Sequence, residues 1–244
     1  MAGTLLAVDA YISRFNEGVE VGAFGPLNLQ SLTLEQPEPE RIERISRMRS
    51  SYGQALDSYS RPQPAEVQFV TDETAADILA MALLGQPAAY TQDSATAETV
   101  DFDARLDRWV ALGVHNLTAI SIPTLTLGTD YEAVLDAGLV KVFSGGATTE
   151  GQTLTVTYDA NERAGERIVF GTDSVLQLRI HGVGVNQATG QRMDFDIWQA
   201  NVSPSGAIEL VSDEFMTLGF TGGMVTPESK TGPFEVRRHA PVAP

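Results

Sequence analysis

The second half of the chain alternates apolar and polar residues with a period of two, the pattern of a β-strand with one buried face. The alternation is clear over residues 153–158, where the polar positions are threonines that favour strands. It runs again over residues 176–185 but shifts by one position at Gly182, where we expect a β-bulge. These two stretches predict antiparallel strands.

Turn residues divide this β-rich half into hairpins. Asn186–Gly190 has a turn composition and leads into a new alternating run from Met193, which predicts a hairpin. The alternation slips once more at Trp198, and a return strand is expected to start at Ile208–Leu210. A further strand is expected over Met216–Phe220, and the first half of the chain has similar short runs. Strands therefore outnumber helices.

One helix is predicted, from about Glu73 to Leu84. Thr71 or Asp72 is suited to be its N-cap, and an apolar stretch follows. Gly85 then ends it. Because this segment is apolar nearly all round, we expect it to pack deeply against the sheet.

Residues 36–62 differ from the rest and are predicted to be an inserted arm. Apolar residues recur there every three or four positions, as in an amphipathic helix, but Gly53 and the flanking prolines equally favour an extended arm. The arm has four closely spaced basic residues: Arg41, Arg44, Arg47 and Arg49. Such a cluster in an acidic chain predicts contact with acidic groups of a partner, although a solvated surface would have the same pattern.

No linker or change in composition divides the chain. We therefore predict a single β-rich domain over residues 1–225, followed by a mobile, proline-containing tail over residues 226–244. The 244 residues are 43% hydrophobic and 20% charged, which is enough apolar surface to form a core.

The charge of the chain restricts its partners. It has 32 acidic and 16 basic residues and a formal net charge of −16, which disfavours tight binding to nucleic acid or to an anionic bilayer. Cysteine is absent, which excludes disulfides and thiolate zinc sites. The first residues lack the pattern of a secretory signal, so we expect synthesis in the cytoplasm.

Motifs for catalysis or cofactor binding are missing: there is no G-x-S-x-G, P-loop or H-E-x-x-H motif, and we expect no cofactor. His115, His181 and His239 are scattered singly. Carboxylates occur together at Asp101, Asp103 and Asp107, and again at Asp194 and Asp196. An i, i+2 pair on a strand points to one face, which would suit a divalent cation, acid–base chemistry or simply a solvated surface. We expect the solvated surface and no metal.

The order of these pieces resembles the major tail tube protein of long-tailed bacteriophages. Three stretches carry the resemblance over most of the chain: Glu43–Ser58, the strand and helix from Glu66 to Gly85, and the run from Phe195 to Gly222. The resemblance implies an antiparallel β-sandwich or barrel with one flanking helix, six copies in a ring, and rings stacked into a tube. Such a protein resides in the virion tail, contacts its own copies and other tail proteins, and lets DNA pass without catalysis.

Within that expectation the arginine cluster of the arm would contact a neighbouring subunit, and Asp194 and Asp196 would contribute negative charge to the lumen. Two alternatives remain. One is another ring-forming virion component, such as a distal tail or capsid decoration protein. The other is a β-barrel enzyme or binding domain that uses Asp101, Asp103, Asp194 and Asp196 with a divalent cation.

Overall fold

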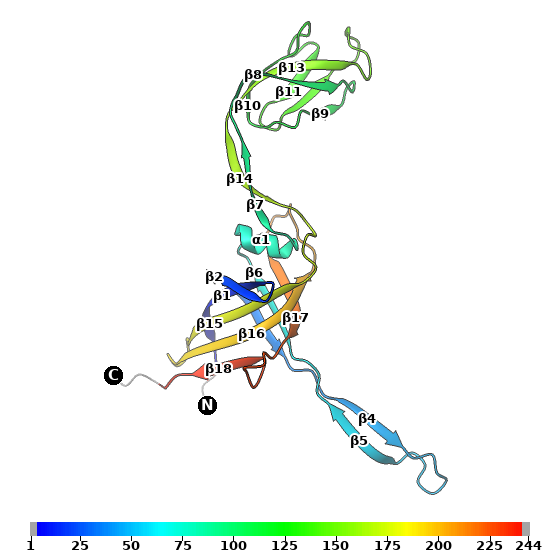
Figure 1. Ribbon diagram of the computed structural model, residues 1–244, viewed down its shortest axis with the longest axis vertical. Helices are drawn as coiled ribbons and strands as arrows, with labels where there is room; N and C mark the ends of the chain where they lie inside the picture. Colours follow the sequence, from blue (N-terminus) through cyan, green and yellow to red (C-terminus); the bar gives the residue numbers. More distant parts are fainter. Residues whose placement is uncertain (1–3, 241–244) are drawn as a thin grey trace. The chain divides into compact units, whose positions relative to one another are not determined.

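The computed structural model describes residues 4–240 and is mainly β, with antiparallel sheets and one short helix among these residues (Figure 1). This confirms the predicted β class. The chain separates into two compact units. The first unit contains the chain up to Pro87 and again from Ile168, and the second contains Ala88–Arg167. The sequence analysis predicts no boundary at either position, because no linker separates the two units.

The first unit is built on one eight-stranded sheet. The strands of this sheet are β1 (Leu6–Asn16), β2 (Val19–Leu27), β3 (Leu29–Glu35), β6 (Glu66–Thr71), β15 (Leu176–Asn186), β16 (Arg192–Ser205), β17 (Leu218–Met224) and β18 (Phe234–Arg238). Their order is β2-β1-β15-β16-β17-β6-β3, with β18 also paired to β16. The β15–β16 hairpin turns at residues 187–191, which confirms the turn predicted from the sequence.

Strand β16 is long enough to pair with two different strands along the same edge. Its residues from Ala200 to Ser205 pair with β17, and its residues from Met193 to Ile197 pair with β18. Residues 226–244 were predicted to be a mobile tail, but 234–238 are a strand of the main sheet. The N-terminal part of β16 would otherwise have unpaired backbone groups, and β18 satisfies them. Residues 241–244 lie outside the described residues.

One face of the sheet packs against the core. Ile12, Phe69, Ile180, Ile197 and Phe220 are fully buried there. The rings of Phe69 and Phe220 stack with centroids 4.8 Å apart. The helix α1 (Ala76–Ala82) adds Ile78 and Met81 to the same core, so the predicted deep packing is confirmed.

The helix is shorter at its start than predicted from Glu73. Thr71 completes the pairing of β6 with β17, and its hydroxyl donates to the Asn28 carbonyl and accepts from the Glu73 amide. Asp72 accepts hydrogen bonds from the side chains of Asn28 and Gln30. Neither residue is therefore free to cap the helix, whose N-cap position is Ala75.

The expected bulge at Gly182 is wrong, whereas the irregularity at Trp198 is confirmed. Alternating burial continues through Gly182 and Gly184, and the pairing of β1 with β15 is regular there. The register between β15 and β16 shifts between Leu178 and Ile180, where β16 has one additional residue near Trp198. The valines after Gly182 simply lie on the other face of the sheet.

The second unit has its own core. Its strands are β7 (Pro87–Gln92), β8 (Ala95–Asp103), β9 (Trp109–Ala111), β10 (Leu117–Ser121), β11 (Tyr131–Val134), β12 (Leu139–Val142), β13 (Thr153–Ala160) and β14 (Arg163–Ile168). They form two three-stranded sheets, β10-β13-β8 and β11-β12-β9, and β7 pairs with β14. Tyr131, Val140 and Val156 are among the residues buried in this core. The strand predicted over residues 153–158 is confirmed as β13.

The predicted arm is a β-hairpin of the first unit, formed by β4 (Glu40–Ile45) and β5 (Ala55–Arg61) (Figure 1). Of the two conformations that the sequence left open, the structure has the extended one. Glu35 and Glu66 face each other in the β3–β6 pair, so the hairpin lies in the connection between two adjacent strands. Every residue of β4 and β5 is exposed.

Residues 206–217 form no strand, so the return strand predicted at Ile208–Leu210 is wrong. Ile208 and Met216 pack against the main core and hold the two ends of this loop. Within residues 4–240, no helix has the length and apolar character needed to span a bilayer.

Candidate functional site

The second face of the main sheet has a charged cluster around Asp196. Tyr11, His181, Asp196 and Glu235 are aligned across four strands by the pairing of β1, β15, β16 and β18. Their neighbours along the strands, such as Ile197, point to the core. Asp196 is only 2% exposed although it lies on this polar face.

Three cationic or potentially cationic side chains surround the Asp196 carboxylate. Its Oδ1 atom lies 2.7 Å from the Nδ1 of His181 and 3.3 Å from an Nη of Arg179. Arg237 donates to its Oδ2 atom. Arg179 also pairs with Glu20 of β2 at 3.2 Å. The charge of Asp196 is therefore balanced within the chain.

These contacts determine the ionisation of Asp196. Burial acts to raise its pKa, but the hydrogen bond and charge of His181 and the hydrogen bonds from Arg237 and Arg179 outweigh burial. The pKa of Asp196 consequently lies below its ordinary value. The carboxylate is charged at neutral pH, and its role in the chain is to hold three strands together.

Asp194 lies two residues before Asp196 on the same face of β16, as the period of two predicted. Its Oδ2 atom is 2.6 Å from the Nε2 of His239. Both carboxylates thus have partners, and the expectation that Asp196 presents free negative charge to a lumen does not fit its burial. The sequence could not indicate this, because the partners come from strands β15 and β18 and from the segment after β18.

The other carboxylates singled out from the sequence lie in the second unit. Asp101 and Asp103 accept hydrogen bonds from Thr155 and Thr153 across the β8–β13 pair. Asp107 accepts from the Ser144 amide. Among the described residues there is no group of three or more metal-ligating side chains. The structure does not bring Asp101 and Asp103 together with Asp194 and Asp196 in one unit.

The four clustered arginines of the arm differ in their partners. Arg41 pairs with Glu43 at 2.6 Å, and Arg44 pairs with Asp57 across the hairpin at 2.8 Å. Arg47 and Arg49 lie in the connecting loop, are exposed, and have no ion pair among the described residues. Within this cluster, they are the two arginines without an ion pair in the described part of the chain.

The loop that carries Arg47 and Arg49, residues 46–54, is held in a defined conformation by hydrogen bonds. Ser46 is buried, and its hydroxyl contacts that of Ser51 at 2.7 Å and accepts from the Met48 amide. The Ser46 amide donates to the Gln54 carbonyl. We call residues 46–54 the arm tip; it displays Met48 and Tyr52, 60% and 78% exposed, beside its two arginines.

A second exposed surface was missed from the sequence. Residues 209–215, which we call the acidic loop, lie between the anchored Ile208 and Met216. The acidic loop contains Glu209, Asp213 and Glu214 together with three large apolar side chains, Leu210, Val211 and Phe215, which are 75%, 97% and 94% exposed. The available signal was the loss of strand alternation after Leu210.

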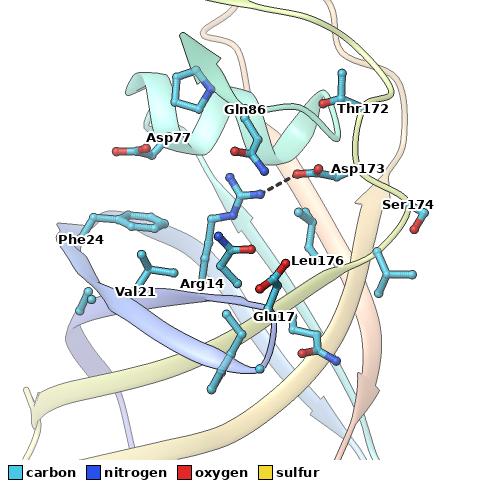
Figure 2. A pocket seen from close by; sticks show the side chains of 18 residues that line it. Arg14, Glu17, Val21, Phe24, Asp77, Gln86, Thr172, Asp173, Ser174 and Leu176 are labelled. Carbon is cyan, nitrogen blue, oxygen red and sulfur yellow. Dashed lines mark hydrogen bonds and ion pairs between the residues drawn. The ribbon is translucent and has the colours of Figure 1, made fainter.

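A cavity of about 960 Å³ lies at one end of the main sheet (Figure 2). Arg14 extends into it from β1 and forms an ion pair with Asp173 at 2.8 Å. Glu17, Asp77 and Gln86 also line it. The lining is mixed in charge, and its central cation is already paired, so the cavity indicates no ligand class.

A family model matches residues 14–234, which is most of the chain; its family is described as protein of unknown function UCP028589. The chain belongs to this family. A search of curated proteins found no match.

Proposed function

We propose that this protein is a structural subunit of the tail tube type, which assembles through its own copies into rings that stack into a tube. The observation that carries the proposal is the β4–β5 arm. An isolated two-stranded hairpin is marginally stable in water, and this one has no core of its own. Its large apolar side chains are 44–78% exposed: Ile42, Ile45, Met48, Tyr52, Leu56 and Tyr59.

This exposure favours a partner that covers the arm. Ile42 and Tyr59 are paired across the hairpin, and we call these two exposed apolar side chains the apolar strip of the arm. Contiguous exposed apolar surface on a folded protein marks an interaction site. The resemblance of the Glu43–Ser58 stretch to tail tube proteins supports another copy of the chain as that partner.

The edges of the main sheet and the charge of the chain support the same function. Strands β2 and β3 pair on one side only within the described chain, and an open strand edge is a template for a neighbouring subunit. Six copies with a formal charge of −16 each would repel phosphates, so DNA could pass through a ring of them without adhering.

The test compares the full chain with a variant in which an Asn-Gly turn replaces residues 37–63. Since Glu35 and Glu66 face each other in the sheet, this replacement closes a short hairpin and leaves Ala65 in the core. We expect the full chain to form rings and tubes as its concentration rises, in sedimentation velocity and negative-stain microscopy. The variant should stay monomeric with an unchanged circular dichroism spectrum.

A matched control keeps the arm and changes only two of its serines, Ser58→Ala with Ser60→Ala. It should assemble like the unmodified chain. A full chain that is monomeric at every concentration would contradict the proposal. Closed rings that never stack would favour the alternative of another ring-forming virion component.

A further inference from the structure

The arm tip and the acidic loop are complementary in charge and in character. The arm tip has two unpaired arginines and no acidic residue, whereas the acidic loop has three carboxylates and no basic residue. Each surface also displays large apolar side chains, Met48 and Tyr52 on the tip and Leu210, Val211 and Phe215 on the loop.

The two surfaces do not cover each other within one chain. Val211 and Phe215 are almost fully exposed, and Tyr52 is 78% exposed, which leaves both surfaces open. Hydrogen bonds or core contacts also fix both surfaces in place. The tip is fixed by the Ser46 hydrogen bonds, and the loop is anchored at both ends by side chains in the main core.

We infer that the arm tip of one copy docks on the acidic loop of another copy. The inference rests on the proposed self-assembly and names the two surfaces that meet. Arg47 and Arg49 would face Glu209, Asp213 and Glu214, while the apolar side chains of both surfaces leave water together. Burial of the apolar side chains supplies most of the affinity, and the charges select the orientation.

A contact between two different surfaces of the same chain is heterologous. Such contacts repeat from copy to copy, and they close into a ring or continue as an open stack. The docking therefore accounts for growth beyond a dimer, which an isologous contact between two identical patches would not.

Charge reversal tests the pairing. Arg47→Glu with Arg49→Glu, or Glu209→Lys with Asp213→Lys and Glu214→Lys, should each lower the assembled fraction by about tenfold or more, because attraction becomes like-charge repulsion. A chain with both sets of reversals regains complementary charges and should assemble again. A control that reverses three exposed carboxylates of the second unit, Glu98→Lys, Glu162→Lys and Glu166→Lys, should assemble normally.

Cross-linking locates the contact. Because the chain has no cysteine, Tyr52→Cys and Val211→Cys can be made in separate preparations, mixed, and joined by a short bismaleimide. A cross-linked dimer should form only in the mixture, and not with either variant alone. Tyr52→Cys mixed with Val134→Cys, an exposed position of the second unit, is the control and should give no dimer.

The outcomes separate the inference from the proposed function. Assembly of the unmodified chain, with rescue by the combined reversal and the mixed cross-link, supports both. Assembly of the unmodified chain without the rescue and without the mixed cross-link overturns the docking and leaves the proposed function in place. A chain that never assembles, with no cross-link, overturns both.

Discussion

The ring of Phe195 lies directly over Gly182, its partner across the β15–β16 pair. A Cβ atom at position 182 would come within 2.1 Å of the ring's Cζ atom. Because Gly182 has no side chain, it leaves the space that the Phe195 ring occupies in the main core.

We expect Gly182→Ala to destabilise the first unit by about 2 kcal/mol, because the ring must move out of a close-packed position. Urea unfolding measures this free energy. Gly223→Ala is the control in the same sheet, since a Cβ there meets nothing within 4 Å; its effect should stay within about 0.5 kcal/mol. Phe195→Leu should reduce the cost of Gly182→Ala, and strictly additive effects would contradict the proposed contact.

Asp196→Asn should also destabilise the first unit. The amide has nearly the same shape, but Arg179 and Arg237 lose their anionic partner, which costs about 1–3 kcal/mol after allowance for their partial exposure. Urea unfolding at neutral pH measures the loss. Asp9→Asn is the control: Asp9 is exposed on β1, and its replacement should change the free energy of unfolding by less than about 0.5 kcal/mol.

The same carboxylate makes stability depend on pH. The pKa of Asp196 is lower in the folded chain than the ordinary value of 3.8, so the unfolded chain binds its proton more readily. The stabilisation is complete above the ordinary value and is lost as the pH falls through the folded value. The difference in unfolding free energy between the unmodified chain and Asp196→Asn should therefore narrow below about pH 4. A difference that stays constant to pH 2 would contradict this.

The sequence predicted the strands and the faces of their side chains better than the contacts between strands. Strands β13 and β15 follow from local alternation, and so does the shared face of Asp194 and Asp196. The partners of Asp196, by contrast, depend on which strands lie beside β16 and in which register. His181 and Arg237 are 15 and 41 residues away from it along the chain. No local pattern contains that information.

In the arm, the local sequence pattern did not determine the conformation. Its apolar residues recur every three or four positions, which is informative only when an element buries one face. In the hairpin every residue of both strands is exposed, so the spacing had no consequence for the conformation. The acidic loop escaped notice for a related reason. Leu210, Val211 and Phe215 would ordinarily indicate a buried segment, and only the structure shows them in solvent.

The apolar strip of the arm should contribute to assembly without contributing to the fold. We expect Ile42→Ser with Tyr59→Ser to leave the urea midpoint of the first unit unchanged, because both side chains are exposed in the single chain. The assembled fraction in sedimentation velocity should fall, since the interface loses apolar burial. Val134→Ser, at an exposed position of the second unit, is the control for loss of surface hydrophobicity. Equal assembly of all three proteins would exclude the strip from the interface.

Duplex DNA should not bind this protein at physiological salt. Affinity for DNA comes from cationic side chains that displace counterions from phosphates, and the chain has twice as many acidic as basic residues. Of its arginines, Arg179 and Arg237 are already engaged by Asp196, and Arg44 is engaged by Asp57. We expect no retardation of duplex DNA in gels at about 150 mM salt, whether the protein is monomeric or assembled.

The loop-reversed variant, with Glu209→Lys, Asp213→Lys and Glu214→Lys, tests whether the assay responds to surface charge. Its three clustered lysines should produce weak retardation that disappears as salt is added. Tight, salt-sensitive binding by the unmodified protein would contradict the proposed function, because a tube that conducts DNA must not retain it.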